Sequence, residues 1–478
     1  MPNQALNLLP ILPEIAVLIA ACTVLLVDLY LADKDRGIDH GLAMLGLATA
    51  LGLTGIAGGG EAVVALGGNV VRDAVSDLLK GATLAISLLA FVYARPWLKD
   101  RGLLTGEFYV LGLFAVLGML VMISAASFLT LYLGLELLSL CLYALVAFDR
   151  DSPAGSEAAM KYFVLGALGS GMLLYGVSMI YGATGSLELA AVAHAIAEQG
   201  AANKVLVFGI AFLVIGIGFK FGAVPFHMWV PDIYEGAPTP VTLFLGSAPK
   251  IAAFALAIRL LVDAMGGLHQ DWQGMLVILS VLSMGIGNLL AIAQTNIKRM
   301  LAYSTISHVG FIFLGLLAGS AQGYAAAMFY AIVYAVMAAG AFGILTILSR
   351  QGFDAENLDD LKGLNDRDPW LAAMMALLMF SMAGVPPAVG FMAKLLVLEA
   401  VVRADMVWLA VVAVFFSVIG AFYYLRVIKL VYFDKPETDA PILATSEVRA
   451  TMTINGLAVL YLGLFPATLL GLCQAAFR

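Results

Sequence analysis

The chain has 478 residues, of which 62% are hydrophobic and only 12% are charged, and its net charge is -7. Soluble domains carry roughly 25% charged residues, so this composition excludes a soluble globular fold. It predicts an all-α polytopic membrane protein, because helices satisfy their own backbone hydrogen bonds in lipid. The charges are spread over short loops without a basic patch, so we expect contact with the lipid bilayer and no nucleic acid partner.

Fourteen apolar segments have about the 17 to 25 residues that a helix needs to cross a bilayer. The first follows a stretch without Lys or Arg and lacks a cleavage site, so we expect it to be a retained helix. In chain order the predicted spans lie near 11–31, 41–57, 74–94, 108–123, 126–147, 157–181, 205–222, 240–264, 272–293, 300–318, 322–348, 370–400, 406–428 and 451–473.

Lys and Arg are unequally divided between the two alternating sets of loops that these spans define. Fourteen fall in one set and four in the other, which includes both chain ends; the four are Arg72, Lys204, Arg403 and Arg478. Positive residues accumulate in cytoplasmic loops. The asymmetry therefore predicts that both termini lie outside the cytoplasm.

Ionisable side chains interrupt several of the apolar segments; they are Glu136, Lys161, Lys220, Lys250 and Lys394. Such a group costs at least about 3 kcal/mol at bilayer depth and usually marks function. Lys161 lies one turn inside its span, where a long basic side chain can instead reach the interface. We expect the same of Lys80 and Arg426 near their span ends. Arg259 is predicted to pair with Asp263 one turn later.

Proline interrupts two spans, the seventh and the twelfth. Lys220 precedes Pro225 by five residues, whereas Lys394 follows Pro387 by seven. Proline removes a backbone donor and clashes with the preceding turn, so each helix should open locally. Open backbone at bilayer depth must face protein or water.

The mirrored order of lysine and proline in these two broken spans is what an inverted repeat produces. It predicts two inverted five-helix repeats, with spans 4 to 8 matching spans 9 to 13 and with helices 7 and 12 broken. The predicted division is therefore 1–105 for three N-terminal transmembrane helices, 106–265 for the first repeat, 266–432 for the second repeat, and 433–478 for a C-terminal loop and the last helix.

Buried Lys and Glu together suit proton carriage. Burial disfavours the charged form of an ionisable group, and a nearby opposite charge favours it. A pair about 4 Å apart interacts by about 4 kcal/mol at an effective dielectric near 20, so a movement of Glu136 relative to Lys220 is enough to load or unload a proton. His227, just past the first break, is either a proton relay or a packing residue.

Weaker candidates open the tenth span, where Lys298, Tyr303 and His308 recur about once per turn or two. They can carry a water wire or bond neighbouring helices. The sequence has no Walker motif, dinucleotide fingerprint, H-E-x-x-H or His/Cys cluster, so we expect no cofactor and no metal in this chain.

Several segments resemble one membrane-protein family, the antiporter-like subunits of the proton-pumping NADH:quinone oxidoreductase (respiratory complex I), which also includes Mrp-type sodium/proton antiporters. Within that family the resemblance is to the branch of subunit N, in its full-length bacterial form. It is carried by Tyr-Glu-Gly-Ala-Pro-Thr-Pro after His227, by Pro-Lys250, by Lys at 394, and by residues 133–139, 160–163, 219–241, 296–308 and 384–394.

The resemblance implies a role for each buried ionisable residue. Glu136 would tune the pumping Lys220, Lys250 would connect the half-channels, and Lys394 would be the exit-side site. Lys161 and His227 would assist transfer along the same axis.

The resemblance also implies the setting of the chain, which would be a non-redox subunit in the bacterial inner membrane with both termini periplasmic. NADH, FMN, iron-sulfur clusters and quinone would reside in partner subunits. Its neighbours would be the antiporter-like subunit M, the small subunits K, A and J, and the lateral helix of subunit L.

Two other functions remain open from the residues. A stand-alone cation/proton antiporter of the Mrp type would carry the same buried charges. A structural membrane scaffold would gain stability when the central charges are neutralised.

Overall fold

The computed structural model describes residues 7–32, 35–57, 61–199, 203–437, 442 and 444–478. Within them the chain is almost entirely helical, with one two-stranded antiparallel hairpin of β1 (Val63–Ala65) and β2 (Val70–Arg72). Lys34, which belongs to the larger set of basic loop residues, and Met1 lie outside the described residues. The predicted helical membrane fold is therefore confirmed for the part of the chain that is described, and the hairpin is an element that the sequence did not predict.

Helices occur at each of the fourteen ranges predicted to cross the membrane. The first half contains α1 (Leu12–Asp28), α2 (Gly37–Ala57), α3 (Ala74–Asp100), α4 (Gly106–Ile123), α5 (Phe128–Val146), α6 (Pro153–Thr184), α7 (Leu189–Gln199), α8 (Lys204–Phe221), α9 (Trp229–Gly236), α10 (Thr239–Gly246), α11 (Ala248–Ala257) and the π-helical turn η4 (Ile258–Ala264). The second half contains α12 (His269–Ile292), α13 (Ile297–Leu317), α14 (Ala321–Leu348), α15 (Leu364–Arg367), α16 (Pro369–Ala383), α17 (Val389–Arg403), α18 (Val407–Phe433), α19 (Ser446–Leu464) and α20 (Ala467–Ala475).

Among the described residues, eleven helices are long and apolar enough to cross a membrane, or twelve if α19 and α20 form one span bent by 75°. The predicted ranges 41–57 and 370–400 are the two that fall short of this criterion; they correspond to α2 and to the broken pair α16 and α17. The chain is a polytopic membrane protein, and the count of fourteen stays a prediction.

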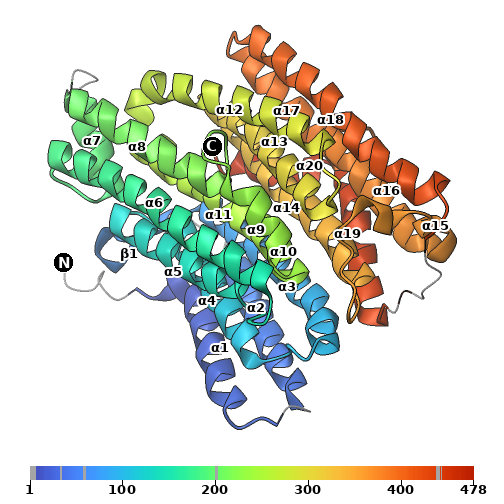
Figure 1. Ribbon diagram of the computed structural model, residues 1–478. Coiled ribbons are helices and arrows are strands. Elements are labelled where there is room, and N and C mark those ends of the chain that lie inside the picture. Colours follow the sequence, from blue (N-terminus) through green and yellow to red (C-terminus); the bar gives the residue numbers. More distant parts are fainter. Residues whose placement is uncertain (1–6, 33–34, 58–60, 200–202, 438–441, 443) are drawn as a thin grey trace.

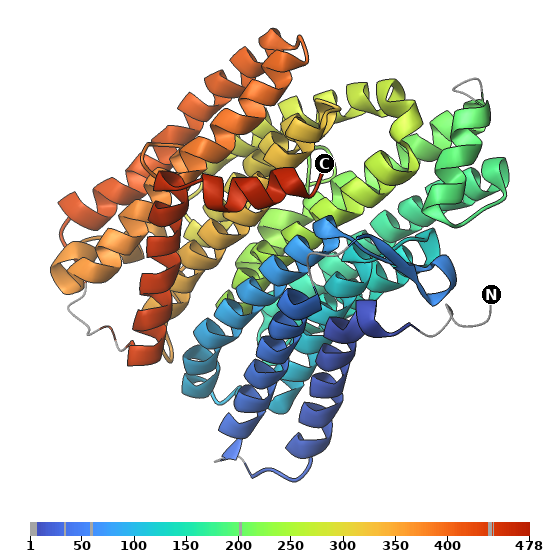
Figure 2. The ribbon, with the colours of Figure 1, turned by 180° about the vertical axis from the view of Figure 1, so that it is seen from behind.

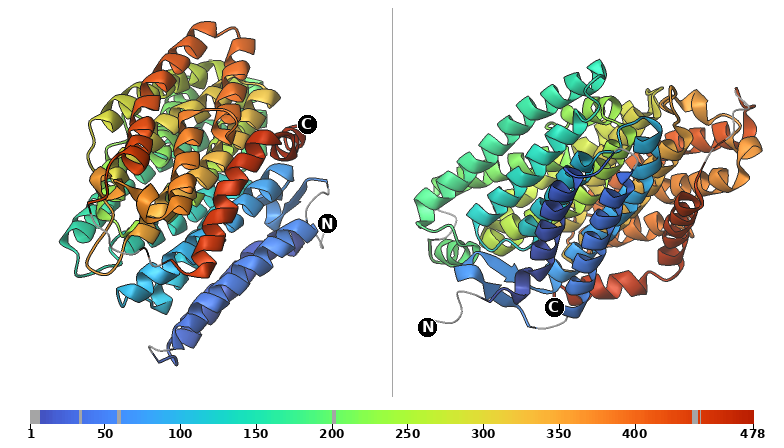
Figure 3. Two further views of the ribbon diagram at one scale, coloured as in Figure 1. Left: turned by 90° about the vertical axis from the view of Figure 1, so that its right-hand side faces the viewer. Right: turned by 90° about the horizontal axis from the view of Figure 1, so that it is seen from below.

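The helices form one bundle in which segments from the middle of the sequence make the interior. In Figure 1 the helices of the first half (green) and of the second half (yellow to orange) lie side by side, and α1 and α2 (blue) lie at one edge. Figure 3 shows α1 and α2 as a pair beside α3. Figure 2 shows α20 turned sharply away from α19. The most apolar windows of α13 and of the segment 239–264 are entirely buried.

Both proline-interrupted spans are broken, as predicted. α8 ends at Phe221 and α9 begins at Trp229, while α16 ends at Ala383 and α17 begins at Val389. In each broken span the first of the two helices ends at a glycine in the left-handed conformation, Gly222 (φ 76°) after α8 and Gly384 (φ 89°) after α16. The N–H of this glycine donates a hydrogen bond back into the last turn of the helix. Glycine adopts this conformation without a steric penalty. A Cβ at Gly384 would also lie 2.9 Å from the Lys394 side chain.

Two predictions about other intramembrane charges have opposite outcomes. Lys80 does not reach the interface: it is 1% exposed and its Nζ lies 2.7 Å from Glu14 Oε1. That prediction was wrong because α1 brings a carboxylate to α3 from far along the chain. Arg259 does pair with Asp263 at 2.8 Å, and it also binds Asp73 through both Nη atoms. The local partner was therefore predictable and the distant one was not.

Candidate functional site

The first cluster of functional candidates lies where α5 faces the end of α8. Lys220 Nζ donates to Ser139 Oγ at 2.7 Å. Ser139 is one turn after Glu136 on α5, and the Glu136 carboxylate interacts electrostatically with Lys220. Glu136 Oε1 is buried and has no hydrogen-bond partner among the described residues. The structure thus brings Glu136 and Lys220 together without closing an ion pair between them.

Lys250 completes this cluster from α11. It is 2% exposed, and its Nζ donates to the carbonyl oxygen of Phe221 at 2.9 Å. Phe221 is the last helical residue before the first break, so its carbonyl has no continuing helix turn to bind. A cavity of about 30 Å³ is lined by Lys220, Lys250 and Ser139 among others. Such a volume accommodates one water molecule between the two lysines.

The second cluster lies at the second break. Lys394 Nζ donates to the carbonyl oxygen of Ala383 and to Ser417 Oγ on α18, both at 2.9 Å. Ala383 is the last helical residue before Gly384, so its carbonyl is the counterpart of the Phe221 carbonyl that binds Lys250. The sequence pattern compared Lys394 with Lys220. In three dimensions, Lys394 shares its hydrogen-bond pattern with Lys250.

His308 connects Lys394 to a buried group of hydroxyl side chains. The histidine interacts electrostatically with Lys394. Its Nδ1 lies 2.8 Å from Tyr330 Oη, and its Nε2 lies 3.0 Å from Tyr424 Oη. Tyr424 Oη is also 2.5 Å from Ser304 Oγ. Hydroxyl groups both donate and accept, so this chain of contacts can pass a proton through the interior.

Aromatic rings of α13 contact both clusters. The ring of Phe221 meets that of Phe313 on α13 with centroids 5.1 Å apart, and Lys394 Nζ lies 5.1 Å from the centroid of Phe311. Within the described residues no hydrogen bond between side chains joins the first cluster to the second. Phe313 of α13 therefore borders the first cluster, and Phe311 of the same helix borders the second.

Two of the other candidates belong to an ion network at the end of the bundle that carries most of the basic loop residues. Lys161 Nζ lies 3.0 Å from Asp232 and 2.9 Å from Glu157, and its side chain is 43% exposed. Lys298 Nζ donates to the carbonyls of Glu235 and Ala237 at 2.8 Å. It also lies 2.9 Å from the Glu356 carboxylate.

Arg299 joins this network, and it binds both Asp232 and Glu235 at 2.7 Å. Lys161, Lys298 and Arg299 therefore hold the end of α9 and the loop 349–357 in place. None of the three contacts either buried cluster by a hydrogen bond among the described residues.

Among the described residues, His227 and Tyr303 take no part in the side-chain hydrogen bonds of the two clusters or of the ion network. His227 lies in the first break beside the exposed Met228, and its Nδ1 is buried without a hydrogen-bond partner among the described residues. Tyr303 is buried in α13, one turn before Ser307. The sequence-based alternatives for His227, a proton relay or a packing residue, therefore both stay predictions.

Known proteins supply an independent view of this arrangement. Residues 125–420 match the family model described as "NADH:quinone oxidoreductase/Mrp antiporter, TM". The NADH-quinone oxidoreductase subunit N of Thioalkalivibrio sulfidiphilus is 58% identical over 471 residues, with 98% of each chain covered. This chain belongs to the NADH:quinone oxidoreductase/Mrp antiporter family. The subunit N of Thiobacillus denitrificans is 56% identical over 476 residues, covering 100% of this chain and 99% of the relative.

Solved structures place this family member in the same fold. A chain of respiratory complex I from Thermus thermophilus with bound aureothin superimposes with a TM-score of 0.83 at 34% identity, covering 96% of this chain and 99% of that chain. A chain of the Mrp complex from Dietzia sp. DQ12-45-1b has a TM-score of 0.86 at 20% identity, covering 100% of this chain and 97% of the other. The second likeness shows the shared fold alone.

Several side chains of this family member that touch the candidates were not found from its sequence. They are Ser139, Ser417, Tyr330, Tyr424 and Asp232. Ser139 had a usable signal, because it follows Glu136 by three residues and so lies on nearly the same helix face. The others come from helices distant in sequence, and their hydroxyl or carboxylate groups carry no local pattern.

Proposed function

We propose that this chain is a proton-translocating membrane-arm subunit of NADH:quinone oxidoreductase, equivalent to subunit N. It would couple quinone reduction elsewhere in the complex to proton transfer along a buried Glu, Lys and His axis. One observation carries the proposal. Buried lysines sit at two helix breaks and bind only neutral oxygens, as required of groups that must gain and release a proton.

The proton path that we propose follows the two clusters. Glu136 tunes the charge of Lys220, the small cavity links Lys220 to Lys250, and Lys394 is the exit-side group. His227, with its unpaired ring nitrogen, assists transfer at the first break. Lys161 belongs at the margin of the path, because it is held by two carboxylates. His308, Tyr303 and Lys298 are secondary members of the path.

Finer features of the architecture belong to the same proposal. They are fourteen transmembrane helices, inverted repeats over spans 4 to 8 and 9 to 13, and the four-part division at 105/106, 265/266 and 432/433. The chain would lie in the bacterial inner membrane with both termini periplasmic. The paired glycine-capped breaks with their lysine-bound carbonyls support the repeats. The charge asymmetry of the loops supports the orientation.

The setting is also proposed. The chain itself would be a non-redox, translocase-type subunit, and NADH, FMN, iron-sulfur clusters and quinone would be bound by partner subunits. Its neighbours would be subunits M, K, A and J and the lateral helix of subunit L. The exposed apolar surfaces of α5 and α18 offer faces that lipid or these neighbours can cover; they include Leu133, Leu140, Val411, Phe415 and Val418.

The test uses the assembled complex in proteoliposomes. Lys220→Ala and Glu136→Gln should each lower NADH-driven quinone reduction and the accompanying acidification by at least about tenfold, because each removes a group that no neighbour replaces. Lys429→Ala is the matched control, since Lys429 is exposed and pairs with Asp434. Normal pumping by both interior variants would remove the proposed function.

A stand-alone Mrp-type cation/proton antiporter is the alternative, because the same buried charges serve either function. Purification distinguishes the two functions. The first requires co-purified redox subunits and NADH-dependent quinone reduction. The alternative requires that the isolated chain dissipate a pH gradient on addition of sodium.

A further inference from the structure

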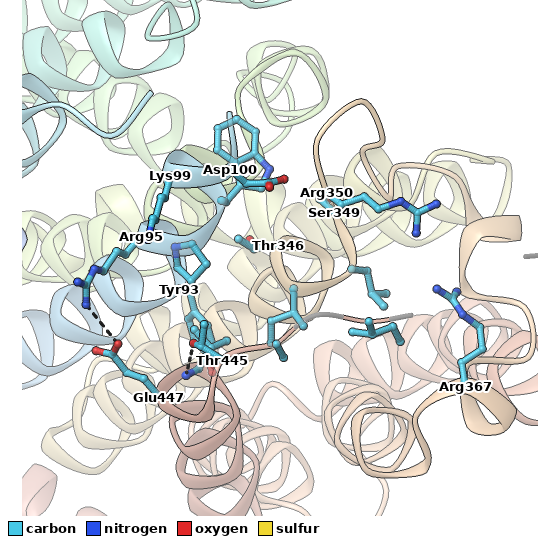
Figure 4. Close-up of a pocket in the computed structure, with 17 residues that line it drawn as sticks. Tyr93, Arg95, Lys99, Asp100, Thr346, Ser349, Arg350, Arg367, Thr445 and Glu447 are labelled. Atoms are coloured by element: carbon cyan, nitrogen blue, oxygen red, sulfur yellow. Dashed lines mark hydrogen bonds and ion pairs between the residues drawn. The ribbon is translucent and has the colours of Figure 1, made fainter. Parts of the chain in front are cut away.

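A large cavity lies away from the buried clusters, at the end of the bundle rich in basic residues. It has a volume of about 600 Å³. Its walls come from the end of α3, the end of α14, the short helix α15 and the start of α19. Figure 4 shows the polar side chains that surround it. Ligand sites typically have volumes of about 300 to 1,000 Å³, so the space suits a molecular group larger than water.

Positive charge dominates the lining of this cavity. Arg95, Lys99, Arg350 and Arg367 line it, against two carboxylates, Asp100 and Glu447. Glu447 is engaged, because its Oε2 lies 3.4 Å from Arg95 Nη1 (Figure 4).

The lining also contains cations whose charge is not balanced. Within the described residues, Lys99 and Arg350 have no carboxylate within 4.0 Å, although Arg350 lies over the ring of Phe353. The nearby Asp354 is already bound by Arg101 at 2.6 Å. The cavity therefore offers uncompensated ammonium and guanidinium groups to an anion.

The remaining walls are apolar or carry hydroxyl groups. Pro96, Ile347, Leu348 and Val448 provide hydrocarbon surface, and Ser349 and Thr445 provide donors. These residues stand at the ends of membrane-crossing helices, where polar headgroups meet hydrocarbon. A site with basic groups and an adjacent apolar wall at this depth suits a ligand that has both a negative charge and a hydrocarbon part. Basic pockets between transmembrane helices on the cytoplasmic side bind anionic lipid headgroups.

We propose that this cavity binds a phosphate group carried by an anionic phospholipid. Lys99 and Arg350 contact the phosphate, because guanidinium and ammonium groups form charge-assisted hydrogen bonds to phosphate oxygens. The apolar wall takes the first carbons of the acyl chains. The bound lipid joins the end of α3 to α14 and α19, which come from distant parts of the sequence.

The experiment measures thermal unfolding and retained lipid of the purified full-length chain with its co-purifying subunits. After delipidation, micelles containing phosphatidylglycerol should raise the unfolding midpoint by about 3 °C, because a ligand stabilises the state that binds it. Phosphatidylcholine and inorganic phosphate should each produce less than about a third of that shift. Native mass spectrometry should detect one retained phosphatidylglycerol that depends on this site.

Substitutions in the cavity lining test whether the shift in the unfolding midpoint comes from lipid bound in this cavity. Lys99→Gln with Arg350→Gln should abolish the phosphatidylglycerol shift, whereas the charge-preserving pair Lys99→Arg and Arg350→Lys should keep it. Arg150→Gln with Lys429→Gln is the matched control, because both residues are exposed basic side chains remote from the cavity lining. Lys99 is exposed and unpaired among the described residues, so Lys99→Gln alone keeps the fold and should lower the shift.

Two results would overturn this assignment. One is an equal shift with inorganic phosphate, which would make the ligand a soluble phosphate. The other is a phosphatidylglycerol shift that survives in the Gln pair, which would place lipid binding elsewhere.

Discussion

The N-terminal helices and the two broken spans both bury lysines, but they treat the charge differently. Lys80 in α3 meets Glu14 at 2.7 Å, and Ser124 Oγ adds a hydrogen bond of 3.1 Å to the same carboxylate oxygen. Lys220, Lys250 and Lys394 bind only hydroxyl and carbonyl oxygens at 2.7 to 2.9 Å. No carboxylate lies within 4.0 Å of these three lysines among the described residues.

This difference separates a structural charge from one that can be exchanged. A buried ion pair holds both partners in their charged forms, and removal of one partner strands the other. A lysine that binds neutral oxygens keeps its hydrogen bonds available whether or not it is protonated, because an amine also donates. Burial alone therefore does not distinguish the two kinds of lysine in this molecule, whereas the presence or absence of a nearby carboxylate does.

The largest expected effect is on stability, in the N-terminal helices. Lys80→Met should lower the free energy of unfolding by about 3–5 kcal/mol, because it leaves the Glu14 carboxylate buried and unpaired. The double variant Glu14→Leu with Lys80→Met should recover most of that loss. Equilibrium unfolding in mixed micelles measures both. A double variant that is stable but fails to pump would instead place this pair in the proton path.

The next effect concerns pumping and should leave stability nearly intact. Lys394→Met should reduce proton translocation at least about tenfold, equivalent to about 1.4 kcal/mol. It strands no carboxylate, so the unfolding midpoint should stay close to that of the unsubstituted chain. Acidification of proteoliposomes and thermal unfolding are measured on the same preparation. A large loss of stability without a loss of pumping would reverse the distinction drawn between Lys394 and Lys80.

A smaller effect should distinguish the two broken spans from each other. Lys220 has Ser139 as its one hydrogen-bond acceptor among the described residues, whereas Lys394 has both Ser417 and the Ala383 carbonyl. Ser139→Ala should therefore slow pumping by about fivefold, the equivalent of one hydrogen bond of about 1 kcal/mol. Ser417→Ala should change it by less than about twofold, since one acceptor remains. Equal effects of the two substitutions would contradict the difference between the sites.

The smallest effect is expected at Arg299, whose ion pairs in the network with Lys161 and Lys298 are partly open to solvent. Arg299→Gln breaks the contacts to Asp232 and Glu235, which are between about one third and two fifths exposed. Exposed ion pairs contribute about 0–1 kcal/mol, so stability should fall by no more than that and pumping should change little. A tenfold loss of pumping in this variant, in the proteoliposome assay, would add Arg299 itself to the proton path.

Local sequence accounts for much of the fold and for part of the site. The apolar ranges locate the helices, and Pro225 and Pro387 locate the breaks, because both depend on residues close in the chain. Glu136, Lys220, Lys250 and Lys394 stand out since any ionisable group in an apolar run is costly. The same local view gave a wrong prediction for Lys80, whose partner Glu14 lies on α1. The sequence around one lysine cannot show whether another helix places a carboxylate next to it.

The amino-acid sequence by itself determined that this chain is a helical membrane protein, where its helices lie, and which buried charges need explanation. Only the tertiary structure decided what each of those charges binds. It paired Lys80 with Glu14, matched Lys394 with Lys250 through the carbonyls of the broken helices, and placed aromatic rings of α13 beside both clusters. Helix formation depends on neighbours in sequence, whereas the neutralisation of a buried charge depends on whichever helix packs against it.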